Sequence, residues 1–192
     1  MPHLRPEIDP EGLEEFSVVF TDRSLNHMSQ RFQQVMRDLS ATLARVRVAD
    51  FRPRRRHRRL IKRNSDLTVS EEPARYTREI YRLYARYIDQ RHGDGDMFPP
   101  SEEQFTGFLT CDWADTRFHC FRDADDTLLA VAVTDHLDDG LSAVYTFFDP
   151  DQEARGLGVN ALLWQIQASH RLGLPYLYLG YWIRQCQKMS YK

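Results

Sequence analysis

Residues 52–63, RPRRRHRRLIKR, have the clearest chemical character in the sequence. They hold seven arginines and one lysine and no acidic residue. Because the planar guanidinium group makes bidentate contacts with phosphate, this basic block is typical of a nucleic-acid-binding segment. A solvated linker without a specific partner is the alternative interpretation.

The end of the sequence, YWIRQCQKMSYK, is a second stretch whose residue types could do chemistry. Terminal tails are commonly polar and small, whereas this one is dense in aromatic and cationic side chains: Tyr181, Trp182, Arg184, Cys186, Lys188, Tyr191 and Lys192. So many aromatic and cationic residues at the end of the sequence indicate either that they line a functional site or that the chain is truncated.

Composition bounds the class of protein. The chain has 192 residues, 42% of them hydrophobic, and predicts one core with an appended segment. Its net charge is −2, but outside the basic block 18 basic residues face 28 acidic ones, so the charge is strongly segregated. No apolar run is long enough to span a membrane, and the first residues do not resemble a signal peptide. We expect a cytoplasmic monomer.

The cysteines argue against a disulfide framework or a metal site. Cys111, Cys120 and Cys186 are odd in number and widely spaced, which favours reduced thiols. The sequence therefore predicts neither a bound metal nor a cofactor.

Hydrophobic periodicity predicts the helices and strands that carry these residues. Apolar spacing favours a helix over 29–46, a short strand over 66–70, and an amphipathic helix within 76–92. Ser101 and Gln104 form a capping-box pattern that begins a helix ending near Leu109. Three apolar runs within 116–149 predict an antiparallel meander. A helix follows, with Leu162, Leu163, Ile166 and His170 on its inner face, and then a buried strand over 175–183.

This order of elements resembles the acyltransferase fold of the GCN5-related N-acetyltransferases. The resemblance implies an α+β fold with a mixed, largely antiparallel sheet. In such folds a glycine-rich loop before the central helix receives a pyrophosphate, and here Gly156 and Gly158 of EARGLG take that place. Glu153 stands where arginine or glutamine is usual, which argues against acetyl-CoA as the donor.

Longer strings are similar to the aminoacyl-tRNA-protein transferases, and the bacterial aspartate/glutamate leucyltransferases look closest. The similarity covers about residues 50–192. It implies transfer of an aminoacyl group, most simply leucyl, from charged tRNA to a protein whose N-terminal residue is Asp or Glu, which marks that protein for degradation. The strings are FRPRRRHRRLIKRNSDL, YARYIDQRHGDGDMFPPSEEQFTGFL, WADTRF, AVAVTDHLDDGLSAVYTFFDPD, LGLPYLYLGYWI and CQKMSYK.

The implied activity suggests roles for individual residues. The acceptor arm of tRNA needs a basic surface, for which the candidates are Arg54, Arg55, Arg58, Arg59, Lys62 and Arg63, with Gly156 and Gly158. Tyr145, Asp149, Tyr178 and Tyr181 are candidates to orient the acceptor amine or to relay its proton. Arg184, Lys188 and Lys192 are candidates to hold the acidic acceptor. Structural roles are the alternative for two of these residues: Tyr178 as a buried strand tyrosine and Asp149 as the start of a turn.

The sequence departs from the family at both ends. Family members carry a cysteine-rich domain before the basic block and further strands after KMSYK. We therefore expect an atypical segment over 1–49, a basic tRNA-binding segment over 50–65, and a catalytic domain over 66–192 that is truncated. The strand over 175–183 should then have an unpaired edge.

Three other functions stay open at this point. An arginyl-tRNA-protein transferase is one, because donor choice depends on the shape of a pocket. The others are an inactive tRNA-binding remnant and a small-molecule N-acetyltransferase.

Overall fold

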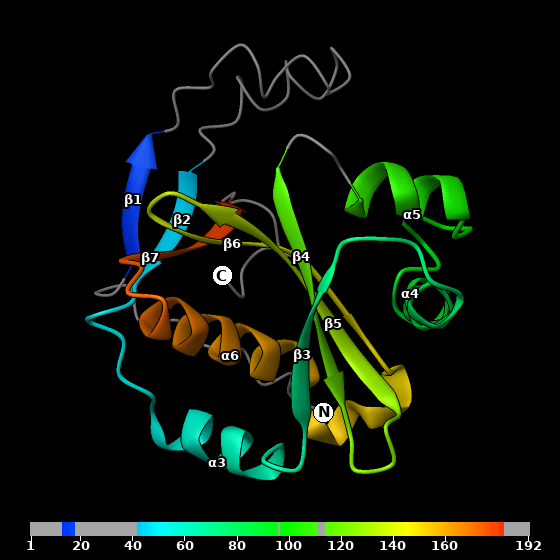
Figure 1. The fold of residues 1–192 in the computed structure, drawn as a ribbon, viewed down its shortest axis with the longest axis horizontal. Coiled ribbons are helices and arrows are strands. Elements are labelled where there is room, and N and C mark those ends of the chain that lie inside the picture. Colours follow the sequence, from blue (N-terminus) through cyan, green and yellow to red (C-terminus); the bar gives the residue numbers. More distant parts are fainter. Residues whose placement is uncertain (1–12, 18–41, 96, 111–113, 183–192) are drawn as a thin grey trace.

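A seven-stranded mixed sheet organises the protein (Figure 1). The computed structural model describes residues 13–17, 42–95, 97–110 and 114–182. In sheet order the strands are β1 (Leu13–Ser17), β2 (Thr42–Arg47), β7 (Tyr176–Trp182), β6 (Gly140–Phe148), β5 (Leu128–Leu137), β4 (Asp115–Arg122) and β3 (Thr68–Pro73). The helices are α3 (Arg55–Arg63), α4 (Arg78–Arg91), α5 (Glu102–Leu109) and α6 (Leu157–Arg171), with a 3-10 turn, η2 (Pro150–Arg155).

Strands β6 and β7 are the one parallel pair of the described sheet, and all other neighbours are antiparallel. Their pairing covers only Gly140–Ser142 against Tyr176–Tyr178, although each strand runs on for several residues. Beyond those residues the two strands have no ladder hydrogen bonds between them. The sheet is therefore splayed at the carboxyl ends of β6 and β7.

Helices α4 and α5 cover one face of this sheet (Figure 1). Each begins at the expected type of cap: the Thr77 hydroxyl accepts from the backbone N–H of Ile80, and the Ser101 hydroxyl accepts from that of Gln104. The predicted amphipathic stripe of α4 is confirmed, since Ile80, Leu83, Tyr84 and Ile88 are buried. Burial of each large apolar side chain contributes ~1.5–3 kcal/mol to the free energy of folding, and this burial keeps the two helices packed on the sheet.

Helix α6 packs on the opposite face, where its buried residues contact β5, β6 and β7. Leu163 and Ile166 face the core as predicted, and Leu162 is partly buried. The prediction for His170 is wrong, because its side chain is exposed in the last turn of α6. The inward positions there belong to Ala168 and Ser169, whose small side chains allow the helix to approach the sheet closely.

The predicted helix over 29–46 is wrong at its C-terminal end, because residues 42–47 form β2. Residues 29–41 lie outside the described part of the chain. Ala44, Val46 and Val48 are buried while Arg45 and Arg47 alternate with them, so the pattern has the two-residue period of a strand.

The predicted unpaired edge of the 175–183 strand is also wrong. β2 pairs with β7 antiparallel from Thr42–Trp182 to Arg47–Tyr176, and β1 pairs with β2 in turn. The backbone groups on that side of β7 are therefore satisfied within the sheet.

The remaining elements follow the sequence prediction with small shifts. The antiparallel meander β4–β5–β6 is confirmed. The short strand begins two residues later than predicted, at Thr68, because Asp66 is held outside the sheet by a bidentate ion pair with Arg155. Among the described residues, no helix is long and apolar enough to cross a bilayer.

Candidate functional site

The basic block is helical and attached to the body of the protein, which a solvated linker would not be. Residues 55–63 form α3, and the N–H of Arg54 donates to Nδ1 of His57 at its start. His57 is half-buried and stacks on Phe51 at 5.8 Å between ring centroids. Burial, followed by the neighbouring Arg56 and Arg54, lowers the pKa of His57, so the ring is neutral near pH 7.

Three contacts fix α3 beside the start of α6. Asn64 is buried, and its amide donates to the backbone carbonyls of Leu60 and Arg155 at 3.0 and 2.9 Å. The Arg63 guanidinium donates to the carbonyl of Ala154. Arg155 in turn makes the ion pair with Asp66, which holds the pKa of that carboxyl below its usual range through hydrogen bonds.

Gly156 occupies the corner at which α3 meets α6. It has φ +59°, in the left-handed region, and a Cβ atom there would lie 2.9 Å from Cδ1 of Leu60. At Gly158 a Cβ atom would lie 3.1 Å from the Phe148 ring. Both glycines of EARGLG therefore have packing reasons of their own: Gly156 lies against Leu60 of the basic helix, and Gly158 lies against Phe148 of β6.

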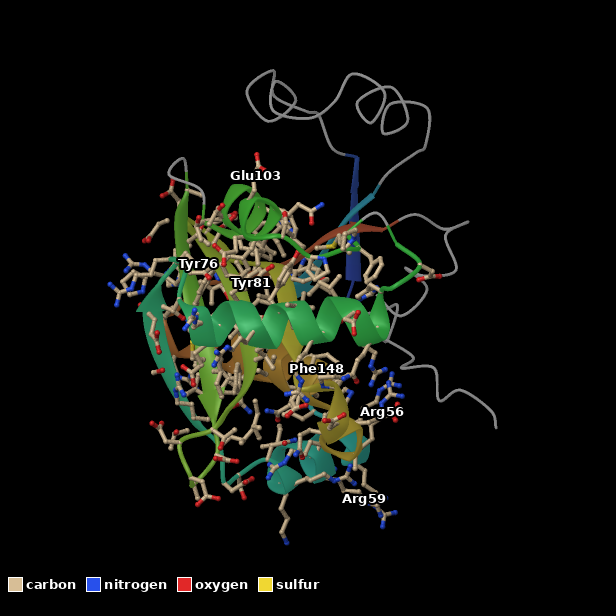
Figure 2. The ribbon with its side chains drawn as sticks, turned by 90° about the vertical axis from the view of Figure 1, so that its right-hand side faces the viewer. Arg56, Arg59, Tyr76, Tyr81, Glu103 and Phe148 are labelled. Carbon is tan, nitrogen blue, oxygen red and sulfur yellow. The ribbon has the colours of Figure 1, made fainter. Side chains whose placement is uncertain are left out.

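The cations of α3 form an exposed surface, which comprises all six arginine and lysine side chains predicted to bind tRNA: Arg54, Arg55, Arg58, Arg59, Lys62 and Arg63. Figure 2 shows Arg56 and Arg59 pointing away from the body of the molecule. In the described part of the chain, no carboxylate forms an ion pair with Arg55, Arg59 or Lys62. Their positive charge is therefore not neutralised within this part of the protein.

Acidic residues lie on the α4 side of the turn that precedes α6. Arg86 pairs with Asp149 at 3.1 Å and with Asp151 at 2.8 Å, and Arg91 lies 3.5 Å from Glu153. These ion pairs join α4 to η2. They also place carboxylates at the turn where a diphosphate would have to bind, which disfavours an acyl-CoA donor.

Asp149 has a structural role in this arrangement. Its carboxylate accepts from the N–H of Asp151 at 3.0 Å and from Arg86, and its side chain is 14% exposed. The alternative interpretation of Asp149 as the start of a turn thus agrees with its contacts.

Tyr145 lies on β6 just beyond the last residue paired with β7, on the face covered by α4 and α5. Its ring meets Phe108 of α5 at 5.5 Å and Tyr87 of α4 at 6.4 Å, and its hydroxyl lies 3.8 Å from the Met97 sulfur. Tyr145 is therefore part of an aromatic wall beside the splayed strands.

Tyr178 of β7 contacts a different set of residues from Tyr145. Its phenol donates to Asp139 at 2.9 Å and accepts from Arg45 at 3.4 Å. Its ring approaches the β5–β6 hairpin so closely that a Cβ at Gly140 would lie 2.9 Å from it. Burial first, and then Asp139, raises the pKa of Tyr178, which makes the phenol a poor proton acceptor at neutral pH.

The side chain of Tyr181, together with Arg184, Lys188 and Lys192, lies outside the described residues. Arg45, on β2, is a cation that the sequence analysis did not single out. Its guanidinium lies 3.6 Å from the centre of the Tyr176 ring, on the Tyr178 side of the sheet.

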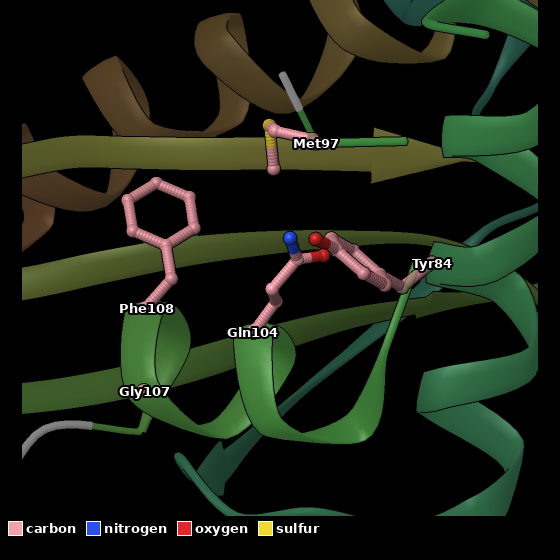
Figure 3. Close-up of a pocket in the computed structure, with 5 residues that line it drawn as sticks. All are labelled: Tyr84, Met97, Gln104, Gly107 and Phe108. Carbon is pink, nitrogen blue, oxygen red and sulfur yellow. The ribbon is translucent and has the colours of Figure 1, made fainter. Parts of the chain in front are cut away.

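A pocket of about 400 Å³ opens between α4, α5 and the loop that joins them (Figure 3). Its lining consists of Tyr84, Met97, Gln104, Gly107 and Phe108. The walls are mostly apolar, and the Tyr84 hydroxyl is fully buried without a hydrogen-bond partner in the described structure. Figure 3 shows that hydroxyl and the Gln104 amide converging on the same space.

The pocket is not evident from the sequence, because each lining residue has an ordinary structural explanation. Tyr84 belongs to the core stripe of α4, and Gln104 completes the capping pattern of α5. Gly107 is the one unusual signal, since a glycine inside a helix destabilises it. A Cβ at position 107 would meet no atom within 4 Å, so the glycine is not required by close packing.

Comparisons with known proteins agree on one family. A family profile described as "Arginine-tRNA-protein transferase, C terminus" matches residues 79–192. The aspartate/glutamate leucyltransferase of Alcanivorax borkumensis is 74% identical over 149 residues, which are 78% of this chain and 61% of that protein. The Pseudomonas fluorescens Pf-5 protein of the same name is 57% identical, covering 78% and 63%. The chain thus spans about three fifths of the length of these curated relatives.

A solved structure shares the fold. L-PGS from Bacillus licheniformis superposes with a TM-score of 0.55 at 11% identity, over 76% of this chain and 46% of that chain. The predicted α+β acyltransferase fold, with a mixed and largely antiparallel sheet, is confirmed.

Replacing Gly156 and Gly107 by alanine should have opposite effects on the free energy of unfolding. Gly156→Ala should lower the free energy of unfolding by roughly 1–2 kcal/mol, because alanine disfavours the left-handed region and its Cβ meets Leu60. Gly107→Ala, the matched control, should raise it by roughly 0.5–1 kcal/mol, because helix propensity improves in open space. Urea unfolding followed by circular dichroism measures both. Equal shifts in the two variants would contradict the structure of the 156 corner.

Proposed function

The chain belongs to the arginine-tRNA-protein transferase family, and on that premise we propose that it transfers a leucyl group from charged tRNA to the N-terminal amine of proteins that begin with Asp or Glu. The observation that carries this proposal is the 74% identity to an aspartate/glutamate leucyltransferase over most of the chain. The protein would act as a monomer in the cytoplasm, where charged tRNA and such proteins occur together.

The reaction replaces an ester by an amide. The unprotonated α-amine of the acceptor attacks the carbonyl carbon of the leucyl ester, a C–N bond forms, and the bond to the ribose oxygen breaks. The amine loses one proton and the ribose oxygen gains one, so the site must accept and return a proton. The α-amine has a pKa of about 8, and a modest local effect therefore suffices to supply its neutral form.

Leucine as the transferred residue is supported by the pocket lined by Met97 and Phe108. Its described lining contains no carboxylate, whereas an arginyl side chain would need one to offset the desolvation of its charge. A buried hydroxyl without a partner costs ~1–3 kcal/mol, so Tyr84 favours a ligand that supplies a hydrogen bond. The carbonyl or amine of the aminoacyl group would do so while the side chain fills the apolar space.

Binding of the tRNA is assigned in this proposal to the basic segment over 50–65. Arg55, Arg59 and Lys62 on α3, which form no ion pair in the described part of the chain, would attract phosphate through counterion release. Asn64 and Gly156 fix the helix beside the start of α6, so the phosphates would be held at a constant distance from the splayed strands. The segment over 66–192 would then carry the chemistry.

We assign the proton relay to Tyr145 among the predicted residues, because it borders both the pocket wall and the splay. Asp149 would act indirectly, by holding η2 to α4 through Arg86. Tyr178 and Arg45 would line the acceptor side of the same face. Tyr181, Arg184, Lys188 and Lys192 remain proposed as further acceptor contacts.

A transfer assay tests the proposed function. Radiolabelled Leu-tRNA and Arg-tRNA are each incubated with the chain and with peptides that begin with Asp or Ala. We expect label from Leu-tRNA on the Asp peptide alone. Label from Arg-tRNA would establish the arginyl alternative, and tRNA binding without any transfer would identify a remnant. Both results contradict the proposal.

A larger side chain in the pocket should lower kcat/KM for leucyl transfer without unfolding the protein. Gly107→Leu projects a side chain from a lining position with open space around it, and we expect kcat/KM to fall at least about ten-fold, or ~1.4 kcal/mol. Gly107→Ala, the control, should stay within about two-fold of the unchanged chain. Measured tRNA affinity should be the same in both variants. Full transfer by Gly107→Leu would exclude the pocket as the leucyl site.

Removal of charge from α3 should weaken tRNA binding in a salt-dependent manner. For the triple variant Arg55→Ala, Arg59→Ala, Lys62→Ala, the slope of log K against log salt should decrease by about 2–3. Fluorescence anisotropy of labelled tRNA across a sodium chloride series measures the slope. The matched control is Arg75→Ala, Arg78→Ala, Arg82→Ala, which removes three exposed arginines at and before α4. Equal loss in both variants would indicate a general charge effect and no dedicated surface.

A further inference from the structure

A polar cluster lies on the opposite face of the sheet from the pocket, beneath α6. Strands β3, β4 and β5 contribute Glu71, His119 and His136, and one ligand-type atom from each lies within 4.8 Å of the others. We propose that these three side chains bind a first-row divalent cation, with Zn²⁺ the best match to a set of two imidazoles and one carboxylate. The cysteine pattern alone predicts no metal, and it does not bear on this ligand set.

The sheet register brings the first two ligands together. Glu71 is paired with His119 across β3 and β4, so both side chains leave the sheet on the same face. Oε2 of Glu71 lies 3.3 Å from Nε2 of His119. Tetrahedral zinc with bonds of about 2.0–2.1 Å places neighbouring ligand atoms roughly 3.3–3.5 Å apart. This pair therefore already has the spacing of two zinc ligands.

His136 supplies the third ligand. Its Nε2 is buried and has no hydrogen-bond partner in the described structure, and its ring lies 6.2 Å from that of His119, centroid to centroid. A buried imidazole nitrogen without a partner is costly, and coordination would offset that cost. Glu71 is half exposed, so its carboxylate can turn toward the cation without disturbing the core.

A second layer of contacts orients His119. Its Nδ1 lies 3.1 Å from the Thr134 hydroxyl, which accepts from the Gln165 amide at 2.7 Å. With Nδ1–H donating to Thr134, the Nε2 lone pair faces the Glu71 carboxylate, and a cation bound by both atoms would remove the repulsion between them. With the proton on Nε2, that nitrogen donates to Glu71 directly. A metal ion and a proton therefore compete for the same position.

Burial and packing suit a neutral, ligating imidazole. His119 is 2% exposed and its ring lies 4.6 Å from that of Trp164, centroid to centroid. The cation would join three strands under α6, and water would complete its coordination on the exposed Glu71 side.

Metal binding to the chelator-treated chain tests the proposal. We expect one Zn²⁺ per chain and visible d–d bands with Co²⁺. A free zinc concentration a hundred times the Kd should raise Tm by roughly 5–10 °C. Glu71→Gln and His136→Gln should each lower zinc affinity at least about ten-fold. Neither change alters a fully buried side chain, so both variants should fold.

His170→Gln is the matched control, because His170 is exposed on α6 and distant in sequence from the cluster. It should bind zinc as the unchanged chain does. The proposal is overturned if the chain shows no zinc-dependent shift in Tm, or if Glu71→Gln and His136→Gln retain the full shift. The readout does not involve tRNA or peptide transfer, so it is independent of the proposed function.

Discussion

The short pairing between β6 and β7 opens the sheet at the carboxyl ends of these two strands. Parallel strands that stay paired would close the sheet and leave no room between their carboxyl ends. Here the ladder stops at Ser142 and Tyr178, and both strands diverge from that point. The divergence can persist because each strand has another partner: β5 holds β6, and β2 holds β7. The opening is thus supported from both sides.

Positive and negative side chains are also segregated in the folded protein. Helix α3 carries its cations on an exposed surface, while Asn64, Leu60 and Arg63 fix it to the turn before α6. The acidic side chains of η2 face α4 instead, where Arg86 and Arg91 neutralise them. The cations of α3 therefore stay exposed to a polyanion such as tRNA, while the carboxylates of η2 are neutralised by α4.

The two faces of the sheet bury polar groups for different reasons. On the α4 and α5 face, the Tyr84 hydroxyl lies in a mostly apolar pocket and has no hydrogen-bond partner among the described residues. On the α6 face, His119 is connected through Thr134 to Gln165 and through Nε2 to Glu71. A hydroxyl without a partner lowers stability, whereas a connected imidazole does not, so the first is explained by a ligand and the second is compatible with a proton or a metal ion.

The amino-acid sequence was sufficient to predict the helices α4, α5 and α6, the meander and the basic surface, because each corresponds to a local pattern of apolar or charged residues. The order of these elements indicated the α+β fold through its resemblance to a known fold. The sequence also indicated the family through strings that run along the chain. The three-dimensional arrangement was needed to show that residues 42–47 form a strand, that β2 pairs along one side of β7, and that Asp149 is held by an ion pair. The same holds for the pocket at Gly107 and the cluster at His119. These features bring together residues distant in sequence, whose side chains have ordinary local explanations, and no local pattern records which strands and helices will meet.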